Sequence, residues 1–291
     1  PLIFPKQSAM NTINKFGILG AGQMGSGIAQ VGAQAGLDIV LVDLNQEVLE
    51  KSQKVMEKSL NKLAEKGKVD DAAQVLARVT FTTKMEDLAD RDFVVEAITE
   101  NEPIKFATFE KLDSILKPEA YLASNTSSIS ITRLAGKTKR DGKVIGMHFM
   151  NPVPLMQLVE IIRGLQTSDE TYQVTKALAE KLGKTTVLSK DSAGFIVNRV
   201  LVPMINEAIS TLYQGIGTVE DIDKAMKLGT HQPMGPLTLA DFVGLDTVLS
   251  ILEVFHESFG DKFKPCPLLK QYVDAGWLGR KTGRGFYTYD K

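Results

Sequence analysis

The sequence has a single cysteine, Cys266, among its 291 residues. This excludes an intrachain disulfide and a metal cluster built on several cysteines, and it fits a reducing compartment. The sequence also lacks an excess of charge of either sign, because its 34 Lys and Arg residues nearly balance its 35 Asp and Glu residues. We therefore expect it to bind neither nucleic acid nor an anionic membrane surface. The longest apolar stretch near the middle, Gly194 to Tyr213, contains four residues that a membrane-spanning helix would not tolerate: Asn198, Arg199, Asn206 and Glu207. These absences predict a soluble, cytoplasmic protein.

Glycine, by contrast, is concentrated in one short motif that follows an apolar run and opens a helical pattern. Its residues are the first candidates for cofactor binding: Gly20, Gly22, Gln23, Met24 and Gly25. Gly20 permits a tight turn, Gly22 lets backbone amides approach a pyrophosphate, and Gly25 lets the helix pack closely on the strand. The amides at the start of the helix favour an anion. The motif therefore predicts a dinucleotide site.

An acidic residue, Asp43, ends the next apolar run and lies 18 residues after Gly25. A carboxylate at this spacing suits the adenosine ribose hydroxyls of NAD and would repel the additional phosphate of NADP. The alternative is that Asp43 is only a turn residue at the end of a strand. We predict that the cofactor is NAD.

Short β-rich runs alternate with helical patterns through the first two thirds of the chain. The expected strands are residues 16–19, 38–43, 79–82, 93–98, 121–124, 144–148, 157–163 and 185–189. This alternation predicts an α/β fold, a doubly wound and mostly parallel sheet of the Rossmann type. The connection at Asn151–Pro154 is too short for a crossover helix, so we expect the strand at 157–163 to pair antiparallel.

The last third of the chain is helical throughout, which predicts a second, all-helical domain. We expect residues 1–9 to be a leader added in cloning, residues 10–190 to form the NAD-binding domain, and residues 191–291 to bind substrate and to dimerise. The boundary falls at Lys190–Gly194, a polar segment that we also expect to cap the next helix.

Ligands of such folds bind beyond the carboxyl ends of the strands. Three groups are expected to ring one cleft there: Glu96 and Glu100, the polar run Ser124–Ser128, and His148. His148 is the best candidate for a group that removes the proton of a substrate hydroxyl while hydride moves to the nicotinamide. The alternative is a structural histidine.

Glu160 is a carboxylate within an apolar strand, where an unpartnered buried charge would be costly. If the two strands are neighbours, Glu160 can accept a hydrogen bond from His148 and fix its tautomer. The alternative is a glutamate on an edge strand that points to water. Asn125, Ser127 and Asn151 offer uncharged groups for a hydroxyl or carbonyl oxygen, although such residues are also common in turns. We expect Asn198, an amide early in an apolar helix, to reach the cleft from the helical domain.

These motifs closely resemble the 3-hydroxyacyl-CoA dehydrogenase family, and within it the short-chain, free-standing 3-hydroxybutyryl-CoA dehydrogenases. The resemblance runs from about Phe16 to the C-terminus. It rests on seven motifs that occur in the same order along the chain as in the family: Gly20–Gly25, Val95–Glu100, Ser124–Ser128, His148–Pro154, Gly194–Arg199, Pro233–Pro236 and Lys281–Tyr287. The resemblance implies a stand-alone enzyme.

The resemblance also implies roles for individual residues. His148 matches the catalytic base and Glu160 matches its partner. Ser127 and Asn198 match the groups that hold the C3 oxygen of the substrate. Two further residues match the nicotinamide side of the cofactor site, Glu100 and Asn151, and Asn151 also matches a support of the histidine. Asn125 is a further candidate for cofactor binding. Two residues of the long helix after Asp43 match a segment that meets the CoA portion, Ser59 and Lys66, although a solvated helix face explains them nearly as well.

The expected reaction is the reversible oxidation of an (S)-3-hydroxyacyl-CoA, such as 3-hydroxybutyryl-CoA, to the 3-oxoacyl-CoA by NAD. Two alternatives remain open. A 3-hydroxyisobutyrate-type dehydrogenase would act on free hydroxy acids with a lysine base, where this chain has Asn198. A non-catalytic NAD-binding protein would need the glycine motif and Asp43 but no pair of His148 and Glu160.

Overall fold

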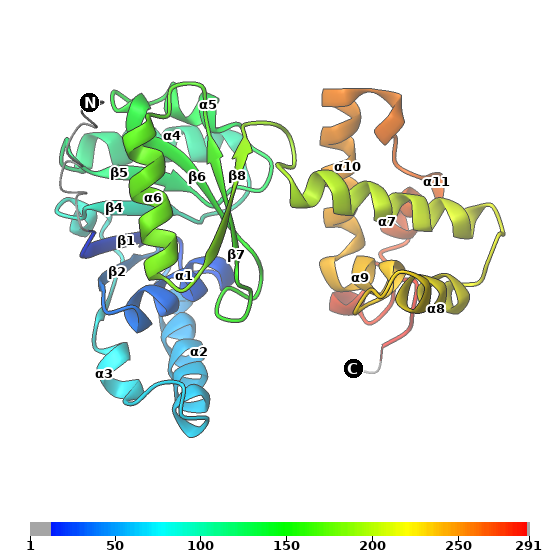
Figure 1. The fold of residues 1–291 in the computed structure, drawn as a ribbon, viewed down its shortest axis with the longest axis horizontal. Coiled ribbons are helices and arrows are strands. Elements are labelled where there is room, and N and C mark those ends of the chain that lie inside the picture. The colour runs from blue at the N-terminus through cyan, green and yellow to red at the C-terminus, as the bar shows by residue number, and fades with distance from the viewer. Residues whose placement is uncertain (1–12, 290–291) are drawn as a thin grey trace, which may run out of the picture. The chain divides into compact units, whose positions relative to one another are not determined.

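The computed structural model describes residues 13–289. The expected leader, residues 1–9, lies outside this range. The chain divides into two compact units, Pro1–Ser192 and Ala193–Lys291, which are drawn in Figure 1. Within residues 13–289, no helix is both long enough and apolar enough to cross a membrane.

The first unit is built on one eight-stranded sheet with the strand order β3-β2-β1-β4-β5-β6-β7-β8. The strands are β1 Lys15–Leu19, β2 Asp38–Val42, β3 Val79–Thr82, β4 Phe93–Glu96, β5 Tyr121–Ser124, β6 Val144–Phe149, β7 Leu158–Arg163 and β8 Thr185–Lys190. All neighbours pair parallel except β6 and β7, which pair antiparallel as predicted from the short connection between them. The predicted α/β class and mostly parallel sheet are confirmed.

Helices lie on both faces of this sheet, with α6 and α4 on opposite faces in Figure 1. The helices of the first unit are α1 Gln23–Gln34, α2 Gln46–Glu65, α3 Ala72–Leu76, α4 Glu102–Ile115, α5 Ile131–Ala135 and α6 Asp169–Lys181. Several begin at a side chain that accepts a backbone N–H, as Asn45 does for α2 and Asn101 for α4. One core cluster joins α1, α2 and α6 to the strands. The central strands β4, β5 and β6 are buried along their whole length because they are covered on both faces.

The second unit is helical. Its helices are α7 Val197–Tyr213, α8 Val219–Gly229, α9 Pro236–Val243, α10 Leu245–Phe259 and α11 Pro267–Asp274. Their apolar faces form one core cluster around Ile205, Leu237 and Leu252. Phe286 and Tyr287 pack against this core near the end of the chain. Their amides donate hydrogen bonds to the buried carboxylate of Asp241. The predicted all-helical second domain is confirmed.

One prediction about the linker is wrong. Lys190–Gly194 does not cap α7, whose N-cap is Ile196. The carboxylate of Asp191 instead accepts hydrogen bonds from the amides of Ile131 and Thr132. Asp191 therefore caps α5, a helix some 60 residues earlier in the chain. The sheet brings the end of β8 beside that helix.

Candidate active site

The glycine turn joins β1 to α1 and is sterically constrained at two positions. Gly20 has a φ of 103°, and a Cβ there would lie 2.6 Å from the carbonyl oxygen of Ala97. A Cβ on Gly25 would lie 1.7 Å from the carbonyl oxygen of Gly20. No larger residue fits either position without moving the backbone, so the turn and the start of α1 are held close together.

Gly22 differs from these two glycines, because a Cβ added to it would meet nothing within 4 Å. Its φ of −66° is also open to any residue. The protein itself therefore gives no steric reason for glycine here. The residue is the N-cap of α1 and is exposed, so the open space lies at the N-terminus of a helix, where amides favour an anion. The site fits a pyrophosphate.

Asp43 follows β2 and accepts one hydrogen bond from the glycine turn and one from its own loop. One carboxylate oxygen accepts from the amide of Ala21 at 2.8 Å and the other accepts from the amide of Asn45 at 3.0 Å. Each oxygen retains a second lone pair, which a ribose hydroxyl could use. A cavity of about 340 Å³ adjoins Asp43 and Gly22 and is lined largely by apolar side chains, including Leu44, Val48 and Ile98. This combination suits an adenosine.

His148 and Glu160 are directly opposite each other in the register of β6 and β7. His148 Nδ1 lies 2.7 Å from Glu160 Oε2. The side chain of Glu160 is fully buried and that of His148 is 10% exposed. Because β7 lies between β6 and β8, Glu160 is not on an edge strand. The expected contact between the two side chains is confirmed, and the alternative of a glutamate that points to water is excluded.

The polar run after β5 is gathered around one oxygen of Glu100. Glu100 Oε1 accepts hydrogen bonds from Thr126 Oγ1 at 2.6 Å, from the amides of Ser127 and Ser128 at 2.9 and 3.1 Å, and from Ser128 Oγ at 2.9 Å. Partial burial disfavours the charged carboxylate, but the nearby ammonium of Lys105 and these hydrogen bonds outweigh it and hold the pKa of Glu100 below its usual value. The structure thus brings two of the three predicted groups together.

The third predicted group is connected through Asn125. Its side-chain oxygen accepts a hydrogen bond of 2.9 Å from the amide of Phe149, the residue after His148. Asn151 lies two residues farther on, is exposed, and precedes a cis proline. The carboxyl ends of β4, β5 and β6 are therefore tied to one another by side chains.

Two lysines of this region were not predicted. Lys105 forms a buried ion pair with Glu96, with Nζ 2.5 Å from Oε1. Lys184 donates hydrogen bonds to the carbonyl oxygens of Val153 and Met156, in the connection that follows His148. Burial lowers the pKa of Lys184. A signal existed for Lys105, since it shares the buried face of α4 with Phe109, four residues later.

The other predicted residues take no part in these hydrogen bonds. Ser59 accepts a hydrogen bond from Gln30 Nε2 at 3.0 Å, on the buried side of α2, whereas Lys66 is the exposed C-cap of that helix. Gln23 is exposed and Met24 packs against the core at the start of α1. Asn198 belongs to the second unit, as the second residue of α7. Its approach to the substrate stays a prediction.

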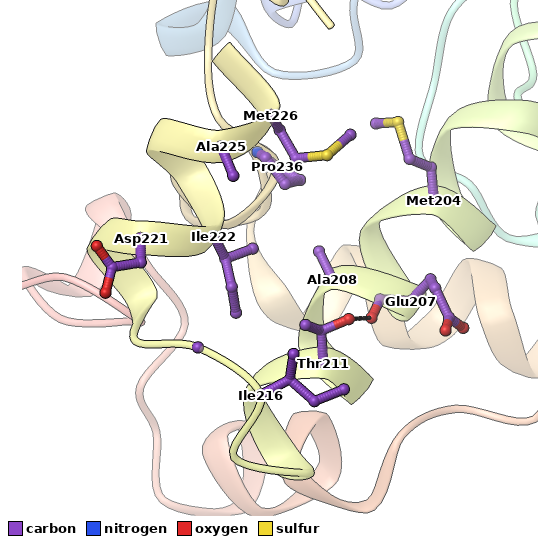
Figure 2. Close-up of a pocket in the computed structure, with 11 residues that line it drawn as sticks. Met204, Glu207, Ala208, Thr211, Ile216, Asp221, Ile222, Ala225, Met226 and Pro236 are labelled. Carbon is purple, nitrogen blue, oxygen red and sulfur yellow. Dashed lines mark hydrogen bonds between the residues drawn. The ribbon is translucent and has the colours of Figure 1, made fainter. Parts of the chain in front are cut away.

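The second unit has a cavity of about 390 Å³ between α7 and α8. Figure 2 shows apolar side chains from both helices around it, among them Ala208, Ile222 and Met226. The hydroxyl of Thr211 is occupied by a hydrogen bond to the carbonyl oxygen of Glu207. A lining of this kind suits another apolar surface better than it suits a charged ligand.

Comparison with known proteins gives a consistent result over nearly the whole chain. A model of the 3-hydroxyacyl-CoA dehydrogenase NAD binding domain matches residues 15–192, and a model of the C-terminal domain of the same enzymes matches residues 194–289. The chain is 59% identical to a Deinococcus radiodurans protein named "Probable 3-hydroxybutyryl-CoA dehydrogenase", over 94% of this chain and 100% of that protein.

A 3-hydroxybutyryl-CoA dehydrogenase of Bradyrhizobium diazoefficiens is 55% identical over 95% of this chain and 96% of its own length. The crystal structure of (S)-3-hydroxybutyryl-CoA dehydrogenase from Ralstonia eutropha superposes with a TM-score of 0.94 at 49% identity, covering 96% of this chain and 100% of that one. The chain therefore belongs to the 3-hydroxyacyl-CoA dehydrogenase family, as an NAD-dependent enzyme whose two domains it carries in order.

Proposed function

We propose that the protein interconverts (S)-3-hydroxybutyryl-CoA and acetoacetyl-CoA with NAD, through proton transfer at His148. The observation that carries this proposal is the contact of 2.7 Å between His148 Nδ1 and Glu160 Oε2. The names of the similar proteins supply the substrate class, and their common substrate has a four-carbon acyl group.

His148 acts as the general base. With Nδ1–H donated to the buried carboxylate of Glu160, the ring presents Nε2 as the atom that accepts the proton of the C3 hydroxyl. The negative charge of Glu160 then stabilises the imidazolium that forms. NAD, held by the glycine motif and Asp43, would supply the acceptor for the hydride of C3. In the reverse direction His148 returns the proton to the C3 oxygen.

Ser127 and Asn198 hold the C3 oxygen by hydrogen bonds. The Ser127 hydroxyl suits this role because its bond to Glu100 Oε1 is long, at 3.4 Å, and is easily exchanged for another. The cofactor contacts are assigned to the glycine motif, with Gln23 and Met24, and to Asp43. The nicotinamide side is assigned to Glu100, Asn125 and Asn151.

The CoA portion is assigned to α2. Lys66 is exposed at the end of this helix, where its ammonium could meet a phosphate. Ser59 is the weaker candidate, because its hydroxyl already accepts a hydrogen bond from Gln30. Residues 10–190 form the NAD-binding domain under this proposal, and residues 191–291 bind substrate and dimerise. The single cysteine and balanced charge favour the cytoplasm.

A homodimer is proposed from the apolar surface of the second unit. Large apolar side chains of this unit are exposed on or beside the helices that line its cavity: Val200, Tyr213, Ile216 and Leu228. A second copy that covers these side chains together with the cavity would remove their apolar surface from water.

The test of the proposed reaction is the loss of NADH absorbance when acetoacetyl-CoA is added to the purified protein. The proposal expects rapid loss with NADH and a much slower reaction with NADPH. Oxidation of free 3-hydroxy acids in preference to the acyl-CoA would favour the 3-hydroxyisobutyrate-type alternative. Bound NADH with no turnover of either substrate would favour a non-catalytic protein.

A further inference from the structure

A buried ion pair lies next to Glu100, the residue that binds the loop carrying Ser127. The side chains of Glu96 and Lys105 are 0% and 1% exposed, and their charged atoms are 2.5 Å apart. Glu96 also accepts hydrogen bonds from the amide of Ile98 and the hydroxyl of Ser124, both at 2.7 Å. Removing two charges from water is expensive, and apolar residues of equal volume often stabilise a fold as well. We therefore looked for a role of this pair other than the stabilisation of the fold.

The ammonium of Lys105 also faces a second carboxylate. Its Nζ lies 3.5 Å from Glu100 Oε2, while the other oxygen of Glu100 accepts the hydrogen bonds of the loop. One cation thus stands between a carboxylate at the end of β4 and the carboxylate that holds Ser127 and Ser128. Glu96 is fixed by the sheet and by its own hydrogen bonds. Its ion pair fixes the ammonium of Lys105, and the attraction of that ammonium in turn holds the carboxylate of Glu100 in place.

Glu100 holds the backbone of the loop more tightly than the hydroxyl of Ser127. The amide of Ser127 donates at 2.9 Å, but its hydroxyl lies at 3.4 Å. The hydroxyl can therefore leave Glu100 for a substrate oxygen while the amide bond keeps the residue in place. An unneutralised Glu100, which is 38% exposed, would instead gain by turning toward water and would release the loop.

We propose that Lys105 is a positioning residue for the reaction, acting through Glu100 to place the hydroxyl of Ser127. This inference depends on the proposed role of Ser127 as a ligand of the C3 oxygen. Lys105 touches neither substrate nor cofactor under this account. Its effect is geometric, and a displacement of about 1 Å at a substrate ligand can lower turnover by about 100-fold.

The variant for the test is Lys105→Met combined with Glu96→Gln. Lys105→Met alone would leave the carboxylate of Glu96 buried without its counter-charge and could unfold the protein. Glu96→Gln removes that charge and keeps a side-chain oxygen for Ile98 and Ser124. The matched control is Arg91→Met, because Arg91 is another buried cation of this unit, 6% exposed, and pairs with Asp38 and Asp90.

The double variant and the control are each measured with Ser127 intact and with Ser127→Ala. We expect the double variant to lower kcat with acetoacetyl-CoA by about 10- to 100-fold when Ser127 is present and by less than about twofold in Ser127→Ala. Backbone amide exchange at Ser127 and Ser128 should become faster. Arg91→Met should change neither kcat nor the exchange at these two residues.

Equal losses of kcat in both backgrounds, or no loss in either, would overturn the inference. A loss in the double variant without faster exchange at Ser127 would overturn it as well. Ser127→Ala alone separates this failure from failure of the proposed function. If that single change leaves kcat unaltered, the assignment of Ser127 as a substrate ligand is wrong, and the inference about Lys105 fails with it.

Discussion

At the scale of the residue, two glycines of one turn have different physical reasons to be glycine. Gly25 is required by the protein, because a Cβ would lie 1.7 Å from the carbonyl oxygen of Gly20. Gly22 has open space around it and an ordinary φ. Packing is sufficient to explain the first glycine, whereas the second is explained by the proposed approach of a pyrophosphate to the start of α1.

We therefore expect Gly22→Ala to weaken NADH binding by at least about tenfold while the melting temperature changes little, because the methyl group would occupy the space of the pyrophosphate. Gly25→Ala should instead lower the melting temperature strongly. Fluorescence titration with NADH and thermal unfolding measure the two effects. Unaltered NADH affinity in Gly22→Ala would show that the phosphates lie elsewhere.

Glu100 gives a pH dependence whose sign follows from its lowered pKa. The folded state binds this proton less tightly than the unfolded state, where the pKa is near the ordinary 4.5. The stabilisation is complete above that value and is lost as pH falls through the lower folded-state pKa. Glu100→Gln has no such group to titrate.

The expected result is that the wild-type protein loses stability relative to Glu100→Gln as the pH is lowered from 6 toward 3.5. Urea midpoints measured for both proteins at several pH values test this expectation. A constant difference between the two midpoints across that range would mean that the Glu100 carboxylate is not stabilised by its neighbours.

At the scale of the element, the strands of the sheet and the helical character of the second unit followed from the sequence because their patterns are local. Valine and isoleucine runs marked the buried strands, and the short connection at Asn151–Pro154 was sufficient to predict the antiparallel pairing of β6 and β7. The pairing of His148 with Glu160 followed from that register. These predictions needed only neighbouring residues and the geometry of a sheet.

Other contacts between distant segments were not predicted. Asp191 caps α5 rather than α7, because the sheet brings β8 beside a helix that is far away in the sequence. Lys105 and Lys184 carry charges that usually indicate solvent, and only their packed surroundings show that they are buried. Sequence patterns predict which face of a helix or strand is buried, but they do not predict the hydrogen-bond partner of each polar side chain.

Arg140 is an example at this scale, since it precedes β6 and binds the end of α4 and the connection from α4 to β5. It pairs with Asp113 at 2.6 Å and donates to the carbonyl oxygens of Leu116, Lys117 and Ala120. We expect Arg140→Met to lower the free energy of unfolding by about 3 kcal/mol, because these acceptors are largely buried. Denaturant unfolding measures the change.

The control is Lys111→Met, which removes an exposed pair with Glu86 at 3.9 Å and should cost less than about 0.5 kcal/mol. Equal effects of Arg140→Met and Lys111→Met would contradict this account of α4. Because Arg140 does not belong to the proposed site, the NADH affinity of the folded variant should stay unchanged.

At the scale of the whole molecule, the proposed function is divided between the sheet unit and the helical unit. The sheet unit contains the glycine turn, Asp43 and the pair of His148 and Glu160, so the cofactor and the base are assigned to one rigid scaffold. The helical unit contains Asn198 and an exposed apolar surface. Self-association and the substrate contact of Asn198 are assigned to it, whereas the substrate contacts of Ser127 and α2 are assigned to the sheet unit.

The proposed homodimer predicts that Ile216→Lys shifts the protein toward the monomer. Ile216 is 71% exposed and lines the cavity of the second unit, so a lysine there would place a charge in the apolar contact. Sedimentation velocity measures the change. Val55→Lys is the control, because Val55 is 56% exposed on α2 of the other unit. A dimer unaffected by Ile216→Lys would place the contact elsewhere.

The central claim is that the imidazole of His148, held by Glu160, moves the proton of the reaction. The most direct measurement compares wild-type protein and His148→Ala for the oxidation of bound NADH by acetoacetyl-CoA, with NADH affinity measured in parallel. The account predicts that the rate falls by about 100- to 10,000-fold while the affinity for NADH stays within about twofold. A rate in His148→Ala close to that of the wild-type protein would contradict it.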